Sequence, residues 1–376
     1  MEHSPSTHPL TPPLTEEEWL SWLRLLRSRR VGPSTFLRLM GEHGSAAAAL
    51  DALPDVARDA GVANYEIADL RAVEAEWHAA RMAGARPIAM GSDDYPALLA
   101  ETPDAPPLVW AMGEISLLKR RMVAVIGARN ASSLGLRMAK RLARELGEAG
   151  FVVVSGMARG IDTAAHQASL ETGTVAVFGG GVDVVYPAEN AVLAQELDEK
   201  GLRLSEQAMH TRPQARHFPR RNRIIAGMAE ATVVVEAAAK SGSLGTARIA
   251  LDQGREVLAV PGHPFDARAA GCNMLIRDGA HLTRSVSDVV AALERPESSA
   301  PEPVVVPADP PSDRPRENTQ KLHKAILSRL GPSPTPEDQL MRDLKRSAGR
   351  VGPELTALEM AGKIRRHAGG MLSRAK

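Results

Sequence analysis

The sequence predicts an α/β protein: a Rossmann-like doubly wound sheet, with a small helical domain before it and a winged helix after it. Three observations lead to this prediction. Short apolar runs alternate with amphipathic helical patterns over residues 85–295. The preceding segment has helical periodicity throughout, and a proline-rich stretch separates the central region from a last helical segment.

The composition narrows the class of protein. The chain has 376 residues, a formal net charge of +1 and a hydrophobic fraction of 44%. This fraction excludes a largely disordered chain, and the near-zero charge means that any nucleic-acid site is a local patch. The single cysteine, Cys272, excludes an intramolecular disulfide and a cysteine-based zinc site. No apolar run approaches the ~20 residues that span a bilayer, and the start lacks a secretory signal, so we expect a cytoplasmic protein without a membrane partner.

The first region is expected to be helical. Residues 1–14 are rich in proline, serine, threonine and histidine, and predict a disordered tail. Thr15 and the three glutamates after it are typical of a helix start, and Trp19 and Trp22 recur with leucines at helical spacing. Residues 15–82 therefore predict a small helical domain.

The central region, 85–295, is expected to hold the sheet. Its strands are apolar on both faces, which is typical of parallel strands covered by helices on both sides. Right-handed crossovers between such strands give a doubly wound sheet. The expected strands are 107–112, 122–126, 151–154, 175–178, 202–205, 232–236 and 257–260, and the expected helices are 134–149 and 161–171.

The last part of the chain predicts a linker and a small domain. Residues 296–316 are rich in proline and charge and cannot pack a core, so they are expected to form an extended linker. Residues 317–376 carry three helical patterns followed by a short hairpin around Gly369 and Gly370, which is the order of a winged helix.

The first candidate site residue lies in a loop after a strand, where doubly wound sheets bind ligands. After the strand that ends at Ile126, Arg129 occupies the position of the second glycine of a dinucleotide fingerprint. The bulk of this side chain argues against a buried NAD. Its guanidinium and the N-terminus of the following helix offer positive charge to a phosphate instead. The alternative is that Arg129 is only a solvated loop residue.

The next two loops add glycines and a second arginine. Arg159 lies in the segment SGMARGID, which suits contacts with backbone and phosphate. Asp162 and His166 share one helix face, but further metal ligands are not evident, so we expect a capping or hydrogen-bonding role and no metal. The three glycines at 179–181 permit the close approach of another backbone or a ligand.

The strongest signal is the basic segment 210–225, HTRPQARHFPRRNRII. It carries five arginines, and no acid occurs between Glu206 and Glu230. Arginines can follow a phosphate backbone while an aromatic ring stacks on a base, which is how proteins hold single strands. A solvated charged surface is the plainer alternative. The candidate binding residues are Arg216, Phe218, Arg220, Arg221, Asn222 and Arg223.

A further loop, KSGSLGT, follows the strand at 232–236. Lys240 and Ser241 offer a cation and a hydroxyl at a helix start, where anions bind readily. Catalysis has little support, because Ser155 lacks the first glycine of a nucleophile elbow and no GxxxxGK[ST] loop is present. We therefore expect neither an enzyme nor a cofactor.

Several motifs follow one another between Val123 and Ala280: VAVIGAR, VVSGMARGIDTAAHQASL, GGGVDVVYP, FPRRNRIIAG, VVVEAAAKSGSLGTA, VPG and GCNMLIRDGA. Together they closely resemble the DprA (Smf) family of DNA-processing proteins. The flanking regions resemble the family's sterile-alpha-motif-like domain and winged helix by layout more than by motif. One departure is Gly245, where the family usually has a branched residue before the threonine.

The resemblance implies a protein that binds single-stranded DNA, protects it, and loads the RecA recombinase onto it in recombination and natural transformation. It also implies a homodimer formed through the Rossmann-like domain, and a DNA pocket lined by Arg129 and the residues around FPxRNR. Leu275 and Ile276 are candidates for the dimer interface or, equally, for the core. The winged helix is expected to contribute at most weak binding of duplex DNA or a partner contact.

Two other functions stay open. Rossmann-like nucleotide phosphoribohydrolases carry a PGGxGTxxE motif, and residues 242–246 resemble its middle. Ile249, however, stands where the glutamate would be, and an apolar side chain cannot act as an acid or stabilise charge. A nucleotide-sensing regulatory module is the other alternative.

Overall fold

A computed structural model of the chain describes residues 10–294, 319–331, 333–346, 348–367 and 371–375. Its contacts divide the chain into two compact units, Met1–Glu297 and Ser298–Lys376. The expected linker and residues 1–9 of the expected tail lie outside the described residues. The helical region and the sheet belong to one unit, where the sequence suggested two domains.

Within the described residues, the sheet of the first unit has nine strands in the order β1-β2-β6-β5-β4-β3-β7-β8-β9. The strands from β6 to β9 are parallel, whereas β1 and β2 form an antiparallel edge beside β6. The predicted doubly wound sheet is confirmed, with this antiparallel edge as an addition. The strands are β1 Arg86–Ala89, β2 Leu108–Gly113, β3 Met122–Ile126, β4 Val152–Ser155, β5 Thr174–Val177, β6 Leu202–Ser205, β7 Ala231–Val234, β8 Glu256–Ala259 and β9 His281–Leu282.

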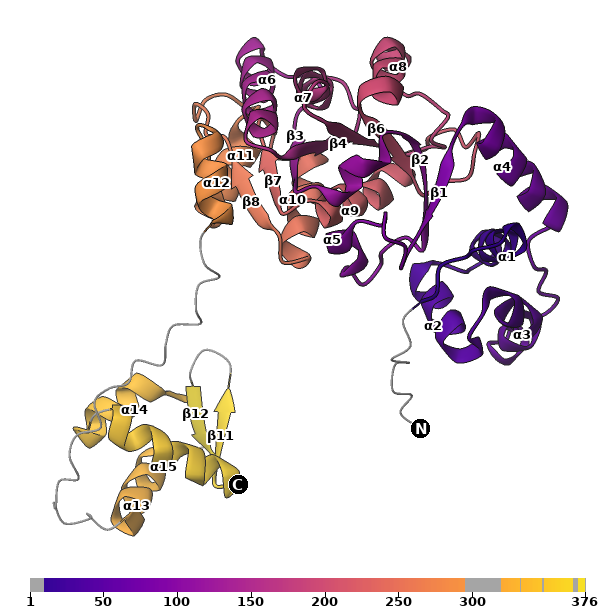
Figure 1. Cartoon of the computed structure of the whole chain (residues 1–376). Helices are drawn as coiled ribbons and strands as arrows, with labels where there is room; N and C mark the ends of the chain where they lie inside the picture. Colours follow the sequence, from indigo (N-terminus) through magenta and orange to yellow (C-terminus); the bar gives the residue numbers. More distant parts are fainter. Residues whose placement is uncertain (1–9, 295–318, 332, 347, 368–370, 376) are drawn as a thin grey trace. The chain divides into compact units, whose positions relative to one another are not determined.

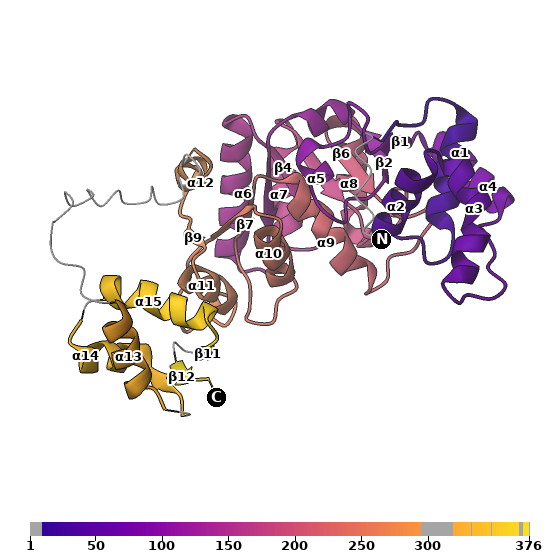
Figure 2. The ribbon, with the colours of Figure 1, turned by 90° about the horizontal axis from the view of Figure 1, so that it is seen from below.

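Helices cover both faces of the sheet (Figures 1 and 2). On one face α6, α7 and α12 pack on a core that includes Val123 and Leu142, and on the other α9, α10 and α11 pack on a core that includes Ile224 and Leu275. The helices are α5 Ala97–Ala100, α6 Ser133–Glu148, α7 Ile161–Ser169, α8 Ala191–Lys200, α9 His217–Met228, α10 Ser243–Asp252, α11 Ala270–Arg277 and α12 Val286–Leu293, with short 3₁₀ helices at Ile115–Lys119 and Ala188–Asn190.

The helical region begins where its capping residues predict. The Thr15 hydroxyl accepts a hydrogen bond from the Glu18 N–H, and the Glu18 carboxylate accepts one from the Thr15 N–H. Residues 10–14 do not behave as a tail, because Leu10 packs against the core and Pro13 is buried. The helices are α1 Glu16–Arg27, α2 Pro33–His43, α3 Ala46–Asp59 and α4 Leu70–Ala83.

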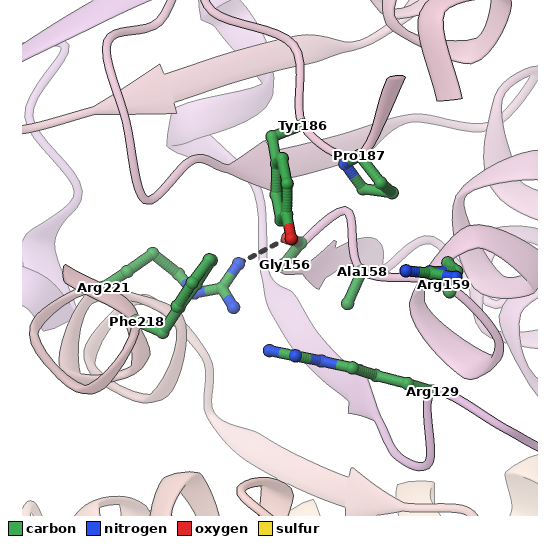
Figure 3. A pocket seen from close by; sticks show the side chains of 8 residues that line it. All are labelled: Arg129, Gly156, Ala158, Arg159, Tyr186, Pro187, Phe218 and Arg221. Carbon is green, nitrogen blue, oxygen red and sulfur yellow. Dashed lines mark hydrogen bonds between the residues drawn. The ribbon is translucent and has the colours of Figure 1, made fainter. Parts of the chain in front are cut away.

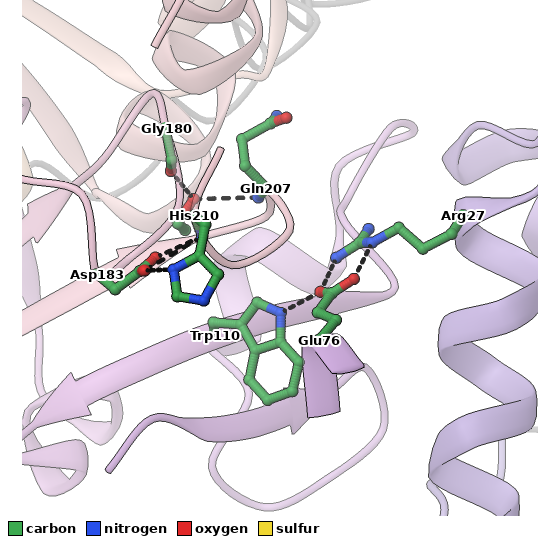
Figure 4. Close-up of polar contacts among 8 residues, drawn as sticks. Arg27, Glu76, Trp110, Gly180, Asp183, Gln207 and His210 are labelled. Atoms are coloured by element: carbon green, nitrogen blue, oxygen red, sulfur yellow. Dashed lines mark hydrogen bonds and ion pairs between the residues drawn. The ribbon is translucent and has the colours of Figure 1, made fainter. Parts of the chain in front are cut away.

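Aromatic side chains join the helical region to the sheet. Trp77 of α4 lies between Trp19 and Trp110, with ring centroids 6.0 and 5.9 Å away. Trp110, in β2, is fully buried, and its indole N–H donates to Glu76 Oε1 at 2.9 Å (Figure 4). Glu76 also accepts from the Arg27 guanidinium. The buried, hydrogen-bonded ring of Trp110 and the two partly buried indoles pack the helical region onto β2 within one unit.

The second unit has the order of a winged helix, as predicted. Its core includes Ile326, Leu340, Leu355 and Leu372. A short strand, β10, pairs with the hairpin in the order β10-β12-β11. The elements are α13 Thr319–Arg329, β10 Thr335–Pro336, α14 Glu337–Leu344, α15 Ala348–Met360, β11 Ile364–His367 and β12 Met371–Arg374. In neither unit is a described helix long and apolar enough to cross a membrane.

Candidate nucleic-acid interface

A pocket opens at the carboxyl ends of β3, β4 and β5, beside the start of α9 (Figure 3). Four predicted site residues line it: Arg129 after β3, Arg159 after β4, and Phe218 and Arg221 from α9. The sheet therefore brings together side chains that lie in three separate segments of the sequence. The remaining lining residues are Gly156, Ala158, Tyr186 and Pro187.

Gly160 allows the first two loops to meet. Its φ is +78°, and a Cβ there would lie 2.3 Å from the Ala128 carbonyl oxygen. The next residue, Ile161, donates its N–H to that same carbonyl. A side chain at residue 160 would force the loop that carries Arg129 away, so the glycine of this segment sets the width of the pocket.

Arg221 supplies a fixed positive charge below the pocket. It is buried, and its Nη1 donates to the carbonyls of Gly156 and of Val177, the latter at 2.9 Å. Burial lowers the pKa of Arg221 to about 10, and the charge of Asp162 opposes this shift. Because this pKa lies well above 7, the guanidinium stays charged at neutral pH.

On the floor of the pocket, the backbone N–H and C=O groups of Gly156 and Ala158 are already hydrogen-bonded within the protein. The buried Asp162 carboxylate accepts from the N–H groups of Gly156 and Ala158, both at 3.2 Å. The Gly156 carbonyl accepts from Arg221, and the Ala158 carbonyl accepts from the Thr163 hydroxyl at 2.7 Å. No backbone N–H of these two residues is left to bond the edge of a base.

Phe218 presents an aromatic ring close to two cations. The guanidinium carbons of Arg129 and Arg221 lie 5.4 and 5.8 Å from the ring centroid, within the range of a cation–π contact. The ring rests against Gly179, where a Cβ would lie 3.2 Å from it. Gly179 therefore makes room for this ring. The predicted close approach of another backbone occurs at Gly180, where a Cβ would lie 2.5 Å from the Thr211 carbonyl oxygen.

The segment that leads into α9 is held by one carboxylate. The carboxylate of Asp183, which follows the glycine run, accepts a hydrogen bond from the His210 backbone N–H at 2.9 Å. The same carboxylate lies 2.6 Å from the Nδ1 atom of the His210 ring (Figure 4). His210 has a φ of +62°, so the chain turns sharply there before the helix. This contact fixes the basic segment against the glycine loop.

The arginines at the rim of the pocket differ in whether a carboxylate of the protein already pairs with them. Arg129 has no carboxylate partner among the residues that the structure describes, whereas Arg159 Nε lies 3.1 Å from Glu189 Oε1. Both members of the Arg159–Glu189 pair are more than half exposed. Arg216 and Arg220 are exposed on the first turns of α9, next to Phe218.

The remaining candidates lie outside the pocket. Arg223 pairs with Glu206 and donates to the Asp104 carbonyl, so its charge is neutralised internally. It follows Arg221 by two positions, about 200° around the helix, and must face away from it. Asn222 accepts from Arg221 Nε at 3.1 Å and supports that side chain. Lys240 and Ser241 follow β7 at the same edge of the sheet, but they do not line the pocket.

The N-terminus of α6 is occupied by a side chain of the protein. Glu236 Oε2 accepts from the Ser132 N–H at 2.8 Å, and a Cβ on Gly135 would lie 2.3 Å from the same oxygen. A Rossmann fold holds a pyrophosphate at this position. Our expectation that this helix end assists Arg129 with a phosphate is therefore wrong, because a carboxylate already fills it.

Asp162 and His166 have structural roles. His166 Nδ1 lies 2.7 Å from Thr174 Oγ1, and burial together with the charge of Arg221 lowers the pKa of His166 to about 3. Burial raises the pKa of Asp162, against the influence of Arg221 and two backbone N–H groups. Among the described residues, no cluster of three or more histidine, cysteine or acidic side chains could hold a metal ion.

The two candidates for a dimer interface are part of the packing of the chain itself. Leu275 is buried in the core, and Ile276 is partly buried against the same core. Leu275 therefore offers no surface to a second chain. Leu282, on the edge strand β9, is an apolar side chain that is 45% exposed.

Three segments of the chain match models of known protein domain families. Residues 86–294 match DNA recombination-mediator protein A, and residues 310–370 match the DprA winged helix domain. Residues 16–79 match the DprA-like N-terminal HHH domain, where the sequence suggested a sterile-alpha-motif-like domain.

Individual relatives agree with these matches. DNA processing protein DprA of Streptococcus pneumoniae is 45% identical over 54% of this chain and 72% of its own length, and Protein Smf of Escherichia coli is 35% identical over 75% and 76%. The structure of the S. pneumoniae protein aligns with a TM-score of 0.61 at 34% identity, over 74% of this chain and 98% of that chain. A second solved structure describes the single-stranded DNA binding mode of DNA processing protein A from Helicobacter pylori. It aligns with a TM-score of 0.52 at 27% identity, over 56% of this chain and 95% of that chain. The chain belongs to the DprA (Smf) family of DNA recombination-mediator proteins.

Proposed function

We propose that this protein binds single-stranded DNA in the pocket at the start of α9, protects the strand and passes it to the RecA recombinase. The observation that carries the proposal is the ring of Phe218 within cation–π distance of the guanidinium groups of both Arg129 and Arg221. An aromatic platform beside cations is the arrangement that holds a base and its phosphates without regard to sequence. The Helicobacter pylori relative binds single-stranded DNA, which supports the same role here.

The saturated floor supports binding without sequence preference. Base identity is read by hydrogen bonds to base edges. The N–H groups of Gly156 and Ala158 are held by Asp162 and cannot make such bonds. Affinity then comes from stacking and from phosphate neutralisation, both of which every DNA sequence provides.

A salt titration on two variants tests the site. Each phosphate neutralised on a single strand contributes about −0.7 to the slope of log K against log salt. Arg129→Ala should weaken binding of all sequences and flatten the slope by about this amount. Phe218→Ala should cost ~1–3 kcal/mol, because a stacking face is lost, and should leave the slope unchanged. Fluorescence anisotropy with labelled oligo-dT at several salt concentrations measures both.

Lys240→Ala is the matched control, because Lys240 is an exposed cation at the same edge of the sheet that does not line the pocket. It should leave affinity and slope near their wild-type values. If Arg129→Ala behaves like Lys240→Ala, Arg129 is a solvated loop residue and the pocket is not the site.

The partner assignments belong to the same proposal. Family membership supports a recombination mediator, and with it a handover of the strand to RecA and a homodimer built on the sheet domain. The exposed Leu282 on the edge strand β9 supports that edge as the contact between subunits. The test of the handover is the lag of RecA filament formation on DNA coated with single-strand-binding protein, which this protein should shorten and Phe218→Ala should not.

A further inference from the structure

The pocket contains a second aromatic ring, Tyr186, which the site described so far does not use. It lies in the segment between β5 and α8 and is 51% exposed. Its ring centroid lies 6.1 Å from that of Phe218, and the two planes are tilted by 40°. Tyr186 therefore presents about half of its surface to solvent inside the pocket (Figure 3).

The other tyrosines of the chain are used differently. The sequence has three, and the hydroxyls of Tyr65 and Tyr95 donate to the backbone carbonyls of Arg29 and Pro106. No protein group among the described residues accepts from the Tyr186 hydroxyl. The hydroxyl of Tyr186 therefore has no partner among the described residues, and about half of the residue stays open to a ligand.

The neighbouring residues fix the place of this ring. Asn190, which is buried, donates its Nδ2 to the Met157 carbonyl at 2.9 Å and to the Thr163 hydroxyl at 3.0 Å. Its N–H donates to the Pro187 carbonyl at 3.1 Å. The segment that carries Tyr186 is therefore tied to the second loop of the pocket, so little backbone freedom has to be lost on binding.

Building on the proposed function, we propose that Tyr186 is a second stacking platform, so that two successive bases of a single strand stack on Phe218 and on Tyr186. Two parallel rings that enclose one base lie about 7 Å apart, because stacked carbon atoms are ~3.5 Å apart. Rings that are 6.1 Å apart and tilted by 40° are too close to enclose a base, and they face in different directions. Successive bases on successive rings match this geometry. Arg129 and Arg159 line the same pocket and supply charge for the phosphates that join the two nucleotides.

The experiment compares two strands on the same variants. Tyr186→Ala, Tyr186→Phe and the wild type are titrated by fluorescence anisotropy with oligo-dT and with an abasic deoxyribose-phosphate strand of equal length. Tyr186→Ala should lose about 5- to 150-fold in affinity for oligo-dT, which corresponds to ~1–3 kcal/mol per stacked base. It should bind the abasic strand like the wild type, with an unchanged salt slope. Tyr186→Phe, which keeps the ring, should retain the wild-type affinity for both strands.

Phe265→Ala is the control for loss of an exposed ring, since Phe265 is 94% exposed and does not line the pocket. It should leave both affinities unchanged. Wild-type affinity of Tyr186→Ala for oligo-dT, together with weak binding by Phe218→Ala, would overturn the proposal for Tyr186 and leave the proposed function intact. If Phe218→Ala also binds normally, the proposed function fails as well. An equal loss of Tyr186→Ala on both strands would assign the residue to backbone contacts and overturn stacking.

Discussion

Glu189 pairs with one arginine of the pocket, and under the proposed function it would compete with DNA for that charge. Its carboxylate lies 3.1 Å from Arg159 Nε at the rim, where both side chains are exposed. An exposed ion pair contributes at most about 1 kcal/mol, so a phosphate can replace the carboxylate. Glu189→Gln should therefore raise the affinity for oligo-dT, by up to about fivefold. Anisotropy titration at low salt measures the change.

The control for this prediction is Glu171→Gln, which removes a second exposed carboxylate, one paired with Lys200 rather than with a pocket residue. Its affinity should equal that of the wild type. A Glu189→Gln variant that binds no more tightly than this control would show that Arg159 does not contact the phosphates.

His166 links the stability of the sheet domain to pH. Its pKa is lowered from 6.5 to about 3 by burial and by Arg221, so the unfolded chain takes up a proton at a higher pH than the folded chain. This contribution to stability is complete above pH 6.5 and is lost as the pH falls towards 3. The free energy of unfolding should fall below pH 6.5, with a slope that approaches ~1.4 kcal/mol per pH unit near pH 5.

Urea denaturation between pH 7 and pH 5 measures this slope. His166→Gln should remove the part of the slope that belongs to this residue, because glutamine does not titrate in this range. His78→Gln, at an exposed histidine, should keep the wild-type slope. Identical slopes for His166→Gln and wild type would show that another group titrates in its place.

The sequence predicts the kinds of side chain at the site better than it predicts which individual residues line the pocket. Arg129, Phe218 and Arg221 were predicted from residue type and position after a strand, and they do meet. Arg223 was included because the basic segment was treated as one run, whereas a helix turns successive arginines to different sides. Tyr186 was missed because a loop tyrosine carries no periodic pattern, although it lies within GGGVDVVYP, one of the motifs that resemble the family.

Among the elements, the first turn of α6 determines which ligands the fold excludes. Glu236 fills the place of a pyrophosphate, so AMP and NAD should not bind in the Rossmann mode. Millimolar AMP or NAD should leave the melting temperature unchanged and should release neither base nor phosphate. Differential scanning fluorimetry and a product assay check both statements. Stabilisation by either nucleotide that persists in Phe218→Ala would support a nucleotide-sensing module instead.

The strands with strong apolar runs were predictable, and the edges of the sheet were not. β3, β4 and β5 are buried on both faces, and their sequences show this. β1, with the sequence RPIA, has a charged residue and a proline in its first half, and β9 has only two residues, so neither shows an apolar run. The antiparallel pairing of β2 depends on β1 and β6, which lie elsewhere in the sequence, so its own apolar residues cannot reveal it.

For the whole molecule, the division into two compact units predicts where DNA affinity is located. A fragment spanning residues 10–297 contains every residue of the pocket and the helical region that packs on β2. Its affinity for oligo-dT should lie within about threefold of the full chain, a difference below ~0.7 kcal/mol. Anisotropy measures this, and light scattering on the same fragment should show a dimer. A loss of more than tenfold would make the winged helix part of the site.

The Asp162 carboxylate that binds the pocket floor limits how far the pocket can distinguish one base from another. The N–H groups of Gly156 and Ala158 are both held by this carboxylate, so this part of the pocket cannot distinguish bases by bonding to their edges. Under the proposed function, this floor would hold foreign and native strands alike. Discrimination between them would then be left to base pairing with a complementary strand, after the proposed handover.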